Sequence, residues 1–350
     1  MTDPFPHVAT MALHPYRLPL TRPLRLSTGV LQAREGVAVQ LKAPSGAEGW
    51  GDVAPLPGFS TETLETATAQ LQTLTAVVEA GVSVTGLRSQ LAACAPSVRF
   101  GVEGAWVALQ ARVQGQTVSA CLGTPRATVM LNGLIVDGDV DAQAVSLQDQ
   151  GYRHVKVKVG RRPVDEEAAR IRRVLAATAP TLQLRLDANR AWTLAEARAM
   201  AAQIDLTRIE YIEEPLADAD ALPTLAADGV PVALDETVHQ APDVPLADWS
   251  YATAFVLKPT LLGLARTRQY LADAAQLGRL VTLSSSFESG LGLALLYALA
   301  ASSPATQTAA GLDTYHWLAE DLLTPRPSWT GPRVPLTAWQ AVSLGPLVPH

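Results

Sequence analysis

Lysine is scarce in this chain, and three of its four lysines occur where charge is unexpected. Among 27 basic residues, Lys156, Lys158 and Lys258 lie within or at the end of segments rich in valine and leucine, whereas Lys42 lies in the first half of the chain. An ammonium group can lose and regain a proton, whereas arginine stays protonated at any usable pH. We therefore expect the three later lysines to take part in chemistry.

Lys156 and Lys158 belong to the alternating run VKVKV at residues 155–159. Because successive side chains of a strand point to opposite faces, both lysines share one face and the valines share the other. In a barrel, the valines would pack outward against helices and both ammonium groups would face the interior. The alternative is a solvent-facing edge strand, where Lys-Val alternation is common.

Acidic residues end the next three strand-like segments. Asp187 ends LQLRLD, Glu213 and Glu214 follow YI, and Asp235 ends VALD. Carboxylates held together there would repel one another without a cation, and an oxygen-only cluster suits a hard divalent ion such as Mg2+ or Mn2+. No His or Cys shares these positions, which argues against zinc. An aspartate at a strand end is also often only a helix N-cap.

The elements that must position these residues form a regular series from about residue 128. Short apolar strands alternate with helical stretches, and neighbouring strand ends lie 22 to 29 residues apart. The ends fall near Leu134, Lys158, Asp187, Glu213, Asp235, Lys258, Ser284 and Leu312. This spacing is typical of βα units, eight of which form a closed barrel with catalytic groups at the carboxyl ends of its strands. The alternative is an open doubly wound sheet, but no Gly-rich turn follows the first strand.

The series divides the chain into an α+β domain at residues 1–118, a (β/α) barrel at 119–312, and a segment at 313–350 that packs back on the first domain. In the first domain, residues 24–26 and 37–41 resemble strands. Ser60 is a plausible N-cap of a helix that runs towards Ala80, and a second helical region covers about 101–113. We expect the first domain to cover the carboxyl ends of the barrel strands.

Composition sets limits on the partners. A net charge of -6 and a pI near 5.6 give no reason to expect nucleic acid or an anionic membrane as a partner. Cys94 and Cys121 are too few for a disulfide framework, which fits a reducing, cytoplasmic setting. The first residues lack the pattern of a signal peptide, and the longest apolar stretch, residues 291–301, is too short to cross a bilayer. The expected partner is a small-molecule carboxylate; the sequence leaves the oligomeric state open.

The order KxK, Asp, Glu, Asp, Lys on successive strand ends resembles the enolase superfamily. The resembling stretches are GWGDVAPLPGFSTET (49–63), VKVKVG (155–160), LRLDANRAW (184–192), IEEPL (212–216), DET (235–237), LKPTLLGL (257–264), SSSFESGLGL (284–293) and GLDT (311–314). The resemblance implies a (β/α) barrel of the enolase type with an N-terminal α+β capping domain. Within the superfamily, the segments 49–63 and 284–293 favour the o-succinylbenzoate synthase family of menaquinone biosynthesis.

The resemblance also implies a role for each site residue. Asp187, Glu213 and Asp235 would bind Mg2+, with Mn2+ as a possible substitute. Lys158 would be the acid/base catalyst, Lys258 would stabilise an enediolate from the opposite side, and Lys156 would help to hold the substrate carboxylate. Asn189, Ser284 and Ser285 would contact the substrate or its surroundings. Strand parity alone does not decide between Glu213 and Glu214; the resemblance favours Glu213.

The implied reaction removes a proton next to a carboxylate, which places a second negative charge on the same group. A divalent ion and a lysine offset that charge, the pattern given for enolase-type sites. The same residues can also carry out 1,1-proton transfer, so an N-acylamino acid racemase, a dipeptide epimerase and a cycloisomerase are alternatives, as is a catalytically silent binding protein. Loops at residues 21–31 and 55–60 could close the site, with Arg25 and Phe59 as weak candidates for substrate contact.

Overall fold

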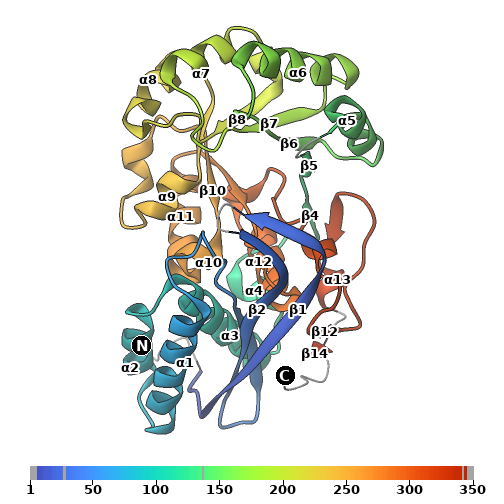
Figure 1. Ribbon diagram of the computed structural model, residues 1–350. Coiled ribbons are helices and arrows are strands. Elements are labelled where there is room, and N and C mark those ends of the chain that lie inside the picture. Colours follow the sequence, from blue (N-terminus) through green and yellow to red (C-terminus); the bar gives the residue numbers. More distant parts are fainter. Residues whose placement is uncertain (1–5, 27–28, 136–137, 341–342, 345–350) are drawn as a thin grey trace.

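The computed structural model describes residues 6–26, 29–135, 138–340 and 343–344. Figure 1 shows an antiparallel sheet with its helices at one end of the molecule and a larger assembly of parallel strands and helices at the other. We call the first part, residues 6–114, the cap. No helix in these ranges is long and apolar enough to span a membrane.

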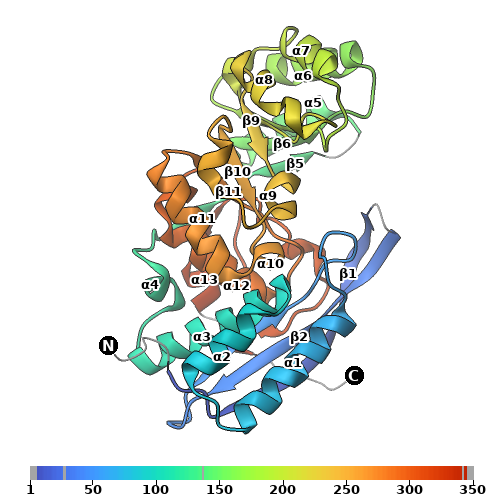
Figure 2. The ribbon, with the colours of Figure 1, turned by 90° about the vertical axis from the view of Figure 1, so that its left-hand side faces the viewer.

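The cap is a three-stranded antiparallel sheet with three helices. The strands are β1 (Thr10–Leu26), β2 (Gly29–Lys42) and β3 (Glu48–Val53), in the order β1-β2-β3, and the helices are α1 (Leu64–Glu79), α2 (Val84–Ala92) and α3 (Pro96–Gln114). A short helix, α4 (Val118–Leu122), follows. Figure 2 shows α3 between the cap sheet and two helices of the second part, α10 (Pro259–Leu262) and α12 (Gly290–Ser302), so α3 joins the two parts.

Backbone packs directly on backbone where β3 meets α3. A Cβ placed on Gly51 would lie 1.9 Å from the carbonyl oxygen of Gly101, and one on Gly49 would lie 2.1 Å from that of Ala105. Only hydrogen fits at these two strand positions. The two glycines of the GWGD stretch are therefore required by the packing of the cap.

Two local predictions for the cap differ from the structure. The strand-like runs are short pieces of β1 and β2, which are much longer because they pair with each other along most of their length. Ser60 does not cap α1; its Oγ accepts a hydrogen bond from the Leu56 N–H at 2.9 Å, in the preceding turn. Thr63 is the N-cap, and its Oγ1 accepts from the Thr66 N–H at 3.2 Å.

The second part contains one parallel sheet of seven strands in the order β11-β10-β9-β8-β7-β6-β5. The strands are β5 (Gly133–Ile135), β6 (His154–Lys158), β7 (Gln183–Asp187), β8 (Ile209–Glu213), β9 (Val232–Leu234), β10 (Ala254–Leu257) and β11 (Leu280–Leu283). The helices are α5 (Val140–Asp149), α6 (Val164–Ala177), α7 (Leu194–Ala201), α8 (Leu222–Ala227), α9 (Glu236–Gln240), α10 (Pro259–Leu262), α11 (Leu264–Gln276) and α12 (Gly290–Ser302). The 3-10 helices are Leu206–Arg208, Ala219–Ala221, Leu246–Trp249, Pro304–Thr306 and Tyr315–Trp317.

Residues 310–311 lie between the segment that precedes β5 and the end of β11. Ala310 forms a parallel bridge with Leu131, and Gly311 forms one with Ser284, directly after β11. The Asn132 N–H donates to the Ala310 carbonyl at 3.0 Å, and the Gly311 N–H donates to the Leu283 carbonyl at 2.8 Å. This segment therefore links the two ends of the region by parallel pairing.

The alternation predicted for β6 is correct. Val155 and Val157 are fully buried in the main apolar core, whereas Lys156 and Lys158 remain partly exposed on the opposite face. On that same face of β7, Arg185 is fully buried; its Nε donates to Glu210 at 2.6 Å and its Nη1 donates to Asn132 at 2.9 Å. Arg185 lies two residues before Asp187, so this charge pair forms a layer beneath the strand ends.

The segment after residue 312 contacts both parts of the molecule. Strand β13 (Arg333–Pro335) pairs with β4 (Thr128–Met130), β12 (Leu323–Thr324) pairs with β14 (Ser343–Leu344), and α13 (Thr337–Gln340) carries Trp339, which stacks on Tyr297 of α12. Closer to residue 313, Leu318 bridges Leu20 of β1. The segment thus packs on the parallel-strand region and touches one edge of the cap.

Candidate active site

The predicted lysines and acids lie at the carboxyl ends of neighbouring strands. In the sheet register, Lys158 of β6 pairs with Asp187 of β7, and Asp187 pairs with Glu213 of β8. Asp235 and Lys258 directly follow β9 and β10, the next two strands. The three lysines and three acids therefore lie together at the carboxyl ends of five neighbouring strands, β6 to β10.

The paired lysines of β6 contact two of the acids directly. Lys156 Nζ lies 2.7 Å from Asp187 Oδ2 and 2.9 Å from both carboxylate oxygens of Glu213. Lys158 Nζ donates to Asp187 Oδ2 and to Asn189 Oδ1, each at 2.7 Å. Asn189 therefore lies next to Lys158, and its predicted contact with the substrate stays a prediction.

The third lysine meets the third acid from the other side. Lys258 Nζ binds both carboxylate oxygens of Asp235. His239, which the sequence analysis missed, holds the same aspartate: its Nδ1 lies 3.0 Å from Asp235 Oδ1, and its Nε2 accepts a hydrogen bond from the Lys258 backbone N–H at 3.0 Å. Burial lowers the pKa of His239, which favours the neutral ring.

The acids at the strand ends differ in how far the lysines offset their charge. Burial raises the pKa of Glu213, and the charges of Asp187 and Asp235 add to this effect, so that it lies well above its ordinary value. Burial acts in the same direction on Asp187, but Lys156 and Lys158 lower its pKa below the ordinary value. Lys156 contacts both acids, yet it cannot offset the repulsion that Glu213 receives from the other two. This crowding is the condition under which an added cation is stabilising.

Glu214 has a different environment from Glu213. It is fully buried, and its Oε1 accepts from the backbone N–H groups of Asp235 at 2.9 Å and Thr237 at 2.7 Å. Its Oε2 accepts from Arg190 Nε at 3.0 Å. These bonds connect the ends of β8 and β9 to the loop after β7. The Glu214 carboxylate therefore stabilises the loops that follow these three strands. Glu213 faces the lysines, as the resemblance implied.

The backbone around these loops is unusual. Asn189, Arg190 and Glu214 all have positive φ, at 46°, 61° and 41°. Such values are uncommon for residues other than glycine and cluster at functional sites. The Arg190 N–H donates to the Glu214 carbonyl at 2.7 Å, which joins two of the three.

The two predicted serines lie on the loop after β11. Ser284 pairs with Gly311, and the Ser285 Oγ lies 2.8 Å from Thr314 Oγ1. Ser285 is almost buried, whereas Ser284 is partly exposed. The neighbouring Phe287 also has positive φ, at 58°. The prediction of a loop at 21–31 is wrong for 21–26 and 29–31, which belong to the paired strands β1 and β2, and residues 27–28 lie outside the described ranges. Arg25 is exposed, and Phe59 is 42% exposed.

The oxygen ligands suit a hard divalent cation. Asp187, Glu213 and Asp235 supply carboxylates only, and Glu236 adds a buried Oε2 that has no hydrogen-bond partner. Within the described ranges no three His, Cys, Asp or Glu side chains already enclose a metal position. The ammonium group of Lys156 contacts Asp187 and Glu213, and that of Lys258 contacts Asp235. The donor chemistry fits Mg2+ or Mn2+, provided that these ammonium groups move aside.

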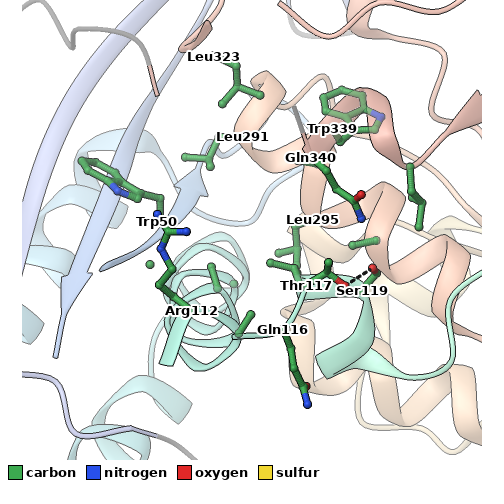
Figure 3. A pocket seen from close by; sticks show the side chains of 18 of the residues that line it. Trp50, Arg112, Gln116, Thr117, Ser119, Leu291, Leu295, Leu323, Trp339 and Gln340 are labelled. Carbon is green, nitrogen blue, oxygen red and sulfur yellow. Dashed lines mark hydrogen bonds between the residues drawn. The ribbon is translucent and has the colours of Figure 1, made fainter. Parts of the chain in front are cut away.

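A cavity of about 830 Å³ lies elsewhere, between the cap and α12. Figure 3 shows Trp50 and Arg112 on one side of it and Trp339 and Gln340 on the other. None of the predicted site residues lines this cavity. The strand-end cluster is therefore distinguished by its chemistry rather than by cavity size.

Comparison with known proteins defines the class. A family described as "Enolase C-terminal domain-like" matches residues 139–339, and one described as "MenC, N-terminal domain" matches residues 8–109. The chain belongs to the enolase superfamily. Its relatives include an o-succinylbenzoate synthase from Edwardsiella ictaluri, 37% identical over 91% of this chain and 94% of the relative. One from Haemophilus influenzae is 33% identical over 93% of this chain and 95% of the relative.

Solved structures support the same fold. A mandelate racemase/muconate lactonizing protein from Herpetosiphon aurantiacus superimposes with a TM-score of 0.84 at 24% identity, covering 98% of this chain and 100% of that one. A dipeptide epimerase from Enterococcus faecalis, complexed with Mg and the dipeptide L-Leu-L-Tyr, gives a TM-score of 0.80 at 20% identity, covering 94% of this chain and 97% of that one. At such low identity these structures establish the fold and leave the reaction to other evidence.

Proposed function

We propose that this chain is an o-succinylbenzoate synthase, a Mg2+-dependent dehydratase. It converts 2-succinyl-6-hydroxy-2,4-cyclohexadiene-1-carboxylate to o-succinylbenzoate and water. The observation that carries the proposal is the match to synthases over more than nine tenths of the chain, combined with lysines facing three acids at the strand ends. The family match of the cap, at residues 8–109, extends the likeness beyond the catalytic strands.

The proposed roles are those that the resemblance to the enolase superfamily implies, and the positions of the side chains support them. Lys158, at the end of β6, takes the proton from the carbon next to the substrate carboxylate. Lys258, at the end of β10, faces the site from the side of Asp235 and stabilises the negative charge that develops on that carboxylate. Lys156, beside Lys158 on the same face, helps to hold the carboxylate.

Asp187, Glu213 and Asp235 would hold Mg2+, with Mn2+ as a possible substitute; the bound ion would offset charge on the substrate carboxylate. The second half of the reaction breaks the carbon–oxygen bond of the neighbouring hydroxyl. Lys158, protonated in the first half, returns its proton to the departing hydroxide, so that water leaves and the ring becomes aromatic. Asn189, Ser284 and Ser285 are proposed to contact the substrate or its immediate surroundings.

We also propose that the seven parallel strands and one further strand form a closed barrel. Residues 309–312 supply the eighth strand, supported by the bridges of Ala310 to Leu131 and of Gly311 to Ser284. The proposed division of the chain is an N-terminal domain at 1–118, which contains the cap, a barrel at 119–312 and a final segment at 313–350. The cap would exclude water from the site through the strand ends at 21–26 and 29–31 and the loop at 55–60.

A spectroscopic assay tests the reaction. Purified protein with Mg2+ should convert the cyclohexadiene carboxylate to o-succinylbenzoate, followed by the change in ultraviolet absorbance as the ring becomes aromatic. Lys158→Ala protein is the matched control and should show no conversion above background. Failure of the wild-type protein in this assay would remove the synthase proposal.

The second candidate is an epimerase or racemase, because the same lysines and acids can also carry out 1,1-proton transfer, and a dipeptide epimerase shares the fold. Exchange of the α-proton of N-succinylamino acids and dipeptides in D2O distinguishes the two. We expect slow exchange or none. Fast exchange without dehydration would replace the synthase by the racemase or epimerase and leave the metal and lysine roles unchanged.

A further inference from the structure

One histidine connects the third acid of the site to the strand that carries the third lysine. His239 lies one helical turn after Asp235, on α9, and its side chain is 8% exposed. Its Nδ1 contacts Asp235 Oδ1, and its Nε2 accepts from the Lys258 N–H, both at 3.0 Å. The ring therefore touches two neighbouring strand ends at once.

The two contacts fix the protonation pattern of the ring. A backbone N–H can only donate, so Nε2 must carry no proton. The proton of the neutral ring is then on Nδ1, where it donates to Asp235. The ring orientation and the tautomer are set by the same pair of bonds.

The bond to the backbone also completes the end of β10. This strand ends at Leu257, so the Lys258 N–H lies beyond the sheet ladder, where it must find another acceptor or remain unsatisfied. His239 Nε2 is that acceptor. His239 therefore holds the backbone at Lys258, the residue whose side chain contacts Asp235.

We propose that His239 is a positioning residue. It orients the Asp235 carboxylate for cation binding, and it holds the main chain of Lys258 in place beside that carboxylate. This inference rests on the proposed function, because it assigns the cation site to Asp235. Asp235 is also held by two other residues: Lys258 binds both of its carboxylate oxygens, and Glu214 accepts its N–H. With Oδ1 held by His239, the carboxylate cannot rotate freely. Hydrogen bonds of this kind behind a metal ligand are typically worth about 10–100-fold in affinity or activity.

Two substitutions test the hydrogen bonds separately from the volume of the ring. Glutamine keeps one donor and one acceptor on a planar group, whereas methionine has a similar size and neither. In His239→Met protein, we expect the Mg2+ dissociation constant, measured by titration calorimetry without substrate, to rise by at least ~10-fold. In His239→Gln protein it should stay within about threefold of the wild-type value. Turnover of His239→Met at saturating Mg2+ should also stay about tenfold lower, because Lys258 is displaced.

His154 provides a matched control. Its ring also contacts a carboxylate, with its Nδ1 3.0 Å from Glu210 Oε2, but it lies at the amino end of β6, whereas the lysines and acids lie at the carboxyl ends. His154→Met should leave Mg2+ affinity unchanged. Circular dichroism spectra establish that each variant is folded.

If folded His239→Met protein binds Mg2+ with the same dissociation constant as the wild-type protein, the inference is wrong. If this variant does not fold, a His239→Gln protein with affinity more than tenfold weaker than wild type would overturn it instead. In both cases the wild-type protein still binds Mg2+ and dehydrates its substrate, so the proposed function stands. If the wild-type protein neither binds Mg2+ nor catalyses dehydration, the proposed function itself fails.

Discussion

Each lysine at the strand ends binds a carboxylate, but the three differ in what they can do. Lys158 is bound to the edge of the cluster, to Asp187 and Asn189, whereas Lys156 lies between two acids and Lys258 faces a third. Lys42, in contrast, forms an exposed pair with Glu48 in the cap at 2.8 Å. Substitution of Lys42 is therefore a control for the loss of a lysine charge outside the site.

Lys158→Ala and Lys258→Ala should each lower turnover by at least ~10³, as expected for loss of a base or of a main electrostatic group. Lys→Arg at either position should not restore the rate, because a guanidinium cannot cycle its proton and has a different shape. Lys42→Ala should leave turnover unchanged. Steady-state rates and circular dichroism spectra measure both effects; a near-normal rate for Lys158→Arg would limit that lysine to charge neutralisation.

The two adjacent glutamates should respond oppositely to the same substitution. Glu214 accepts hydrogen bonds from two backbone N–H groups and Arg190, so Glu214→Gln should lower the free energy of unfolding by about 3 kcal/mol, the size typical of breaking a buried charged pair. Glu213→Gln should abolish activity without destabilising the metal-free protein, because it removes a charge that burial and two other acids disfavour. Urea unfolding in EDTA measures both. Equal destabilisation by the two substitutions would contradict the separate roles.

At the scale of elements, the cap depends on the contact of β3 with α3. Gly51→Ala would push a methyl group against the Gly101 carbonyl oxygen, 1.9 Å away, and neither backbone can yield easily. We expect a loss of about 3 kcal/mol or failure to fold. Gly104→Ala, in the same helix, meets only the end of the Leu295 side chain and should cost far less. Thermal unfolding of the two proteins provides the comparison, and similar melting temperatures would refute the steric argument.

The positions of the elements were easier to predict from the sequence than their contacts. Alternation in VKVKV predicted which side of β6 carries the lysines, because a strand shifted by one residue would bury charge. The strand ends from Lys158 to Ser284 were predicted closely because parallel strands and their helices repeat at a regular interval. Thr63, and not Ser60, caps α1, since Ser60 is used by the turn before it.

The residues that sequence reasoning missed act through partners far away in the chain. Glu214 was distinguished from Glu213 only by resemblance, and the structure gives the reason in its bonds to Asp235 and Thr237. His239 was not singled out, although its spacing of four residues from Asp235 on a helix was a usable signal. Its second partner, Lys258, could not be inferred without the packing of β10 beside β9.

At the scale of the whole molecule, a bound cation should stabilise the folded chain. Anything that binds only the folded state adds about 2.7 kcal/mol at 100 times its dissociation constant. We therefore expect Mg2+ to raise the melting temperature by a few degrees relative to EDTA at equal ionic strength. EDTA should abolish activity, Mg2+ or Mn2+ should restore it, and Asp235→Asn should remove most of the thermal shift. Full turnover in exhaustively metal-free protein would contradict the metal assignment.

The contact between β1 and residues near 318 has a consequence for synthesis of the protein. Thr21 donates to the His316 carbonyl, 295 positions later, and the Ala319 N–H donates to the Pro19 carbonyl. A ribosome adding 5–20 residues per second needs roughly 15 to 60 s to make the intervening chain. During that time, this edge of the first long hairpin lacks its final partner and is open to pairing with other nascent chains. Control of that interval, by chaperones or by the pace of translation, would decide how much of the newly made protein escapes aggregation.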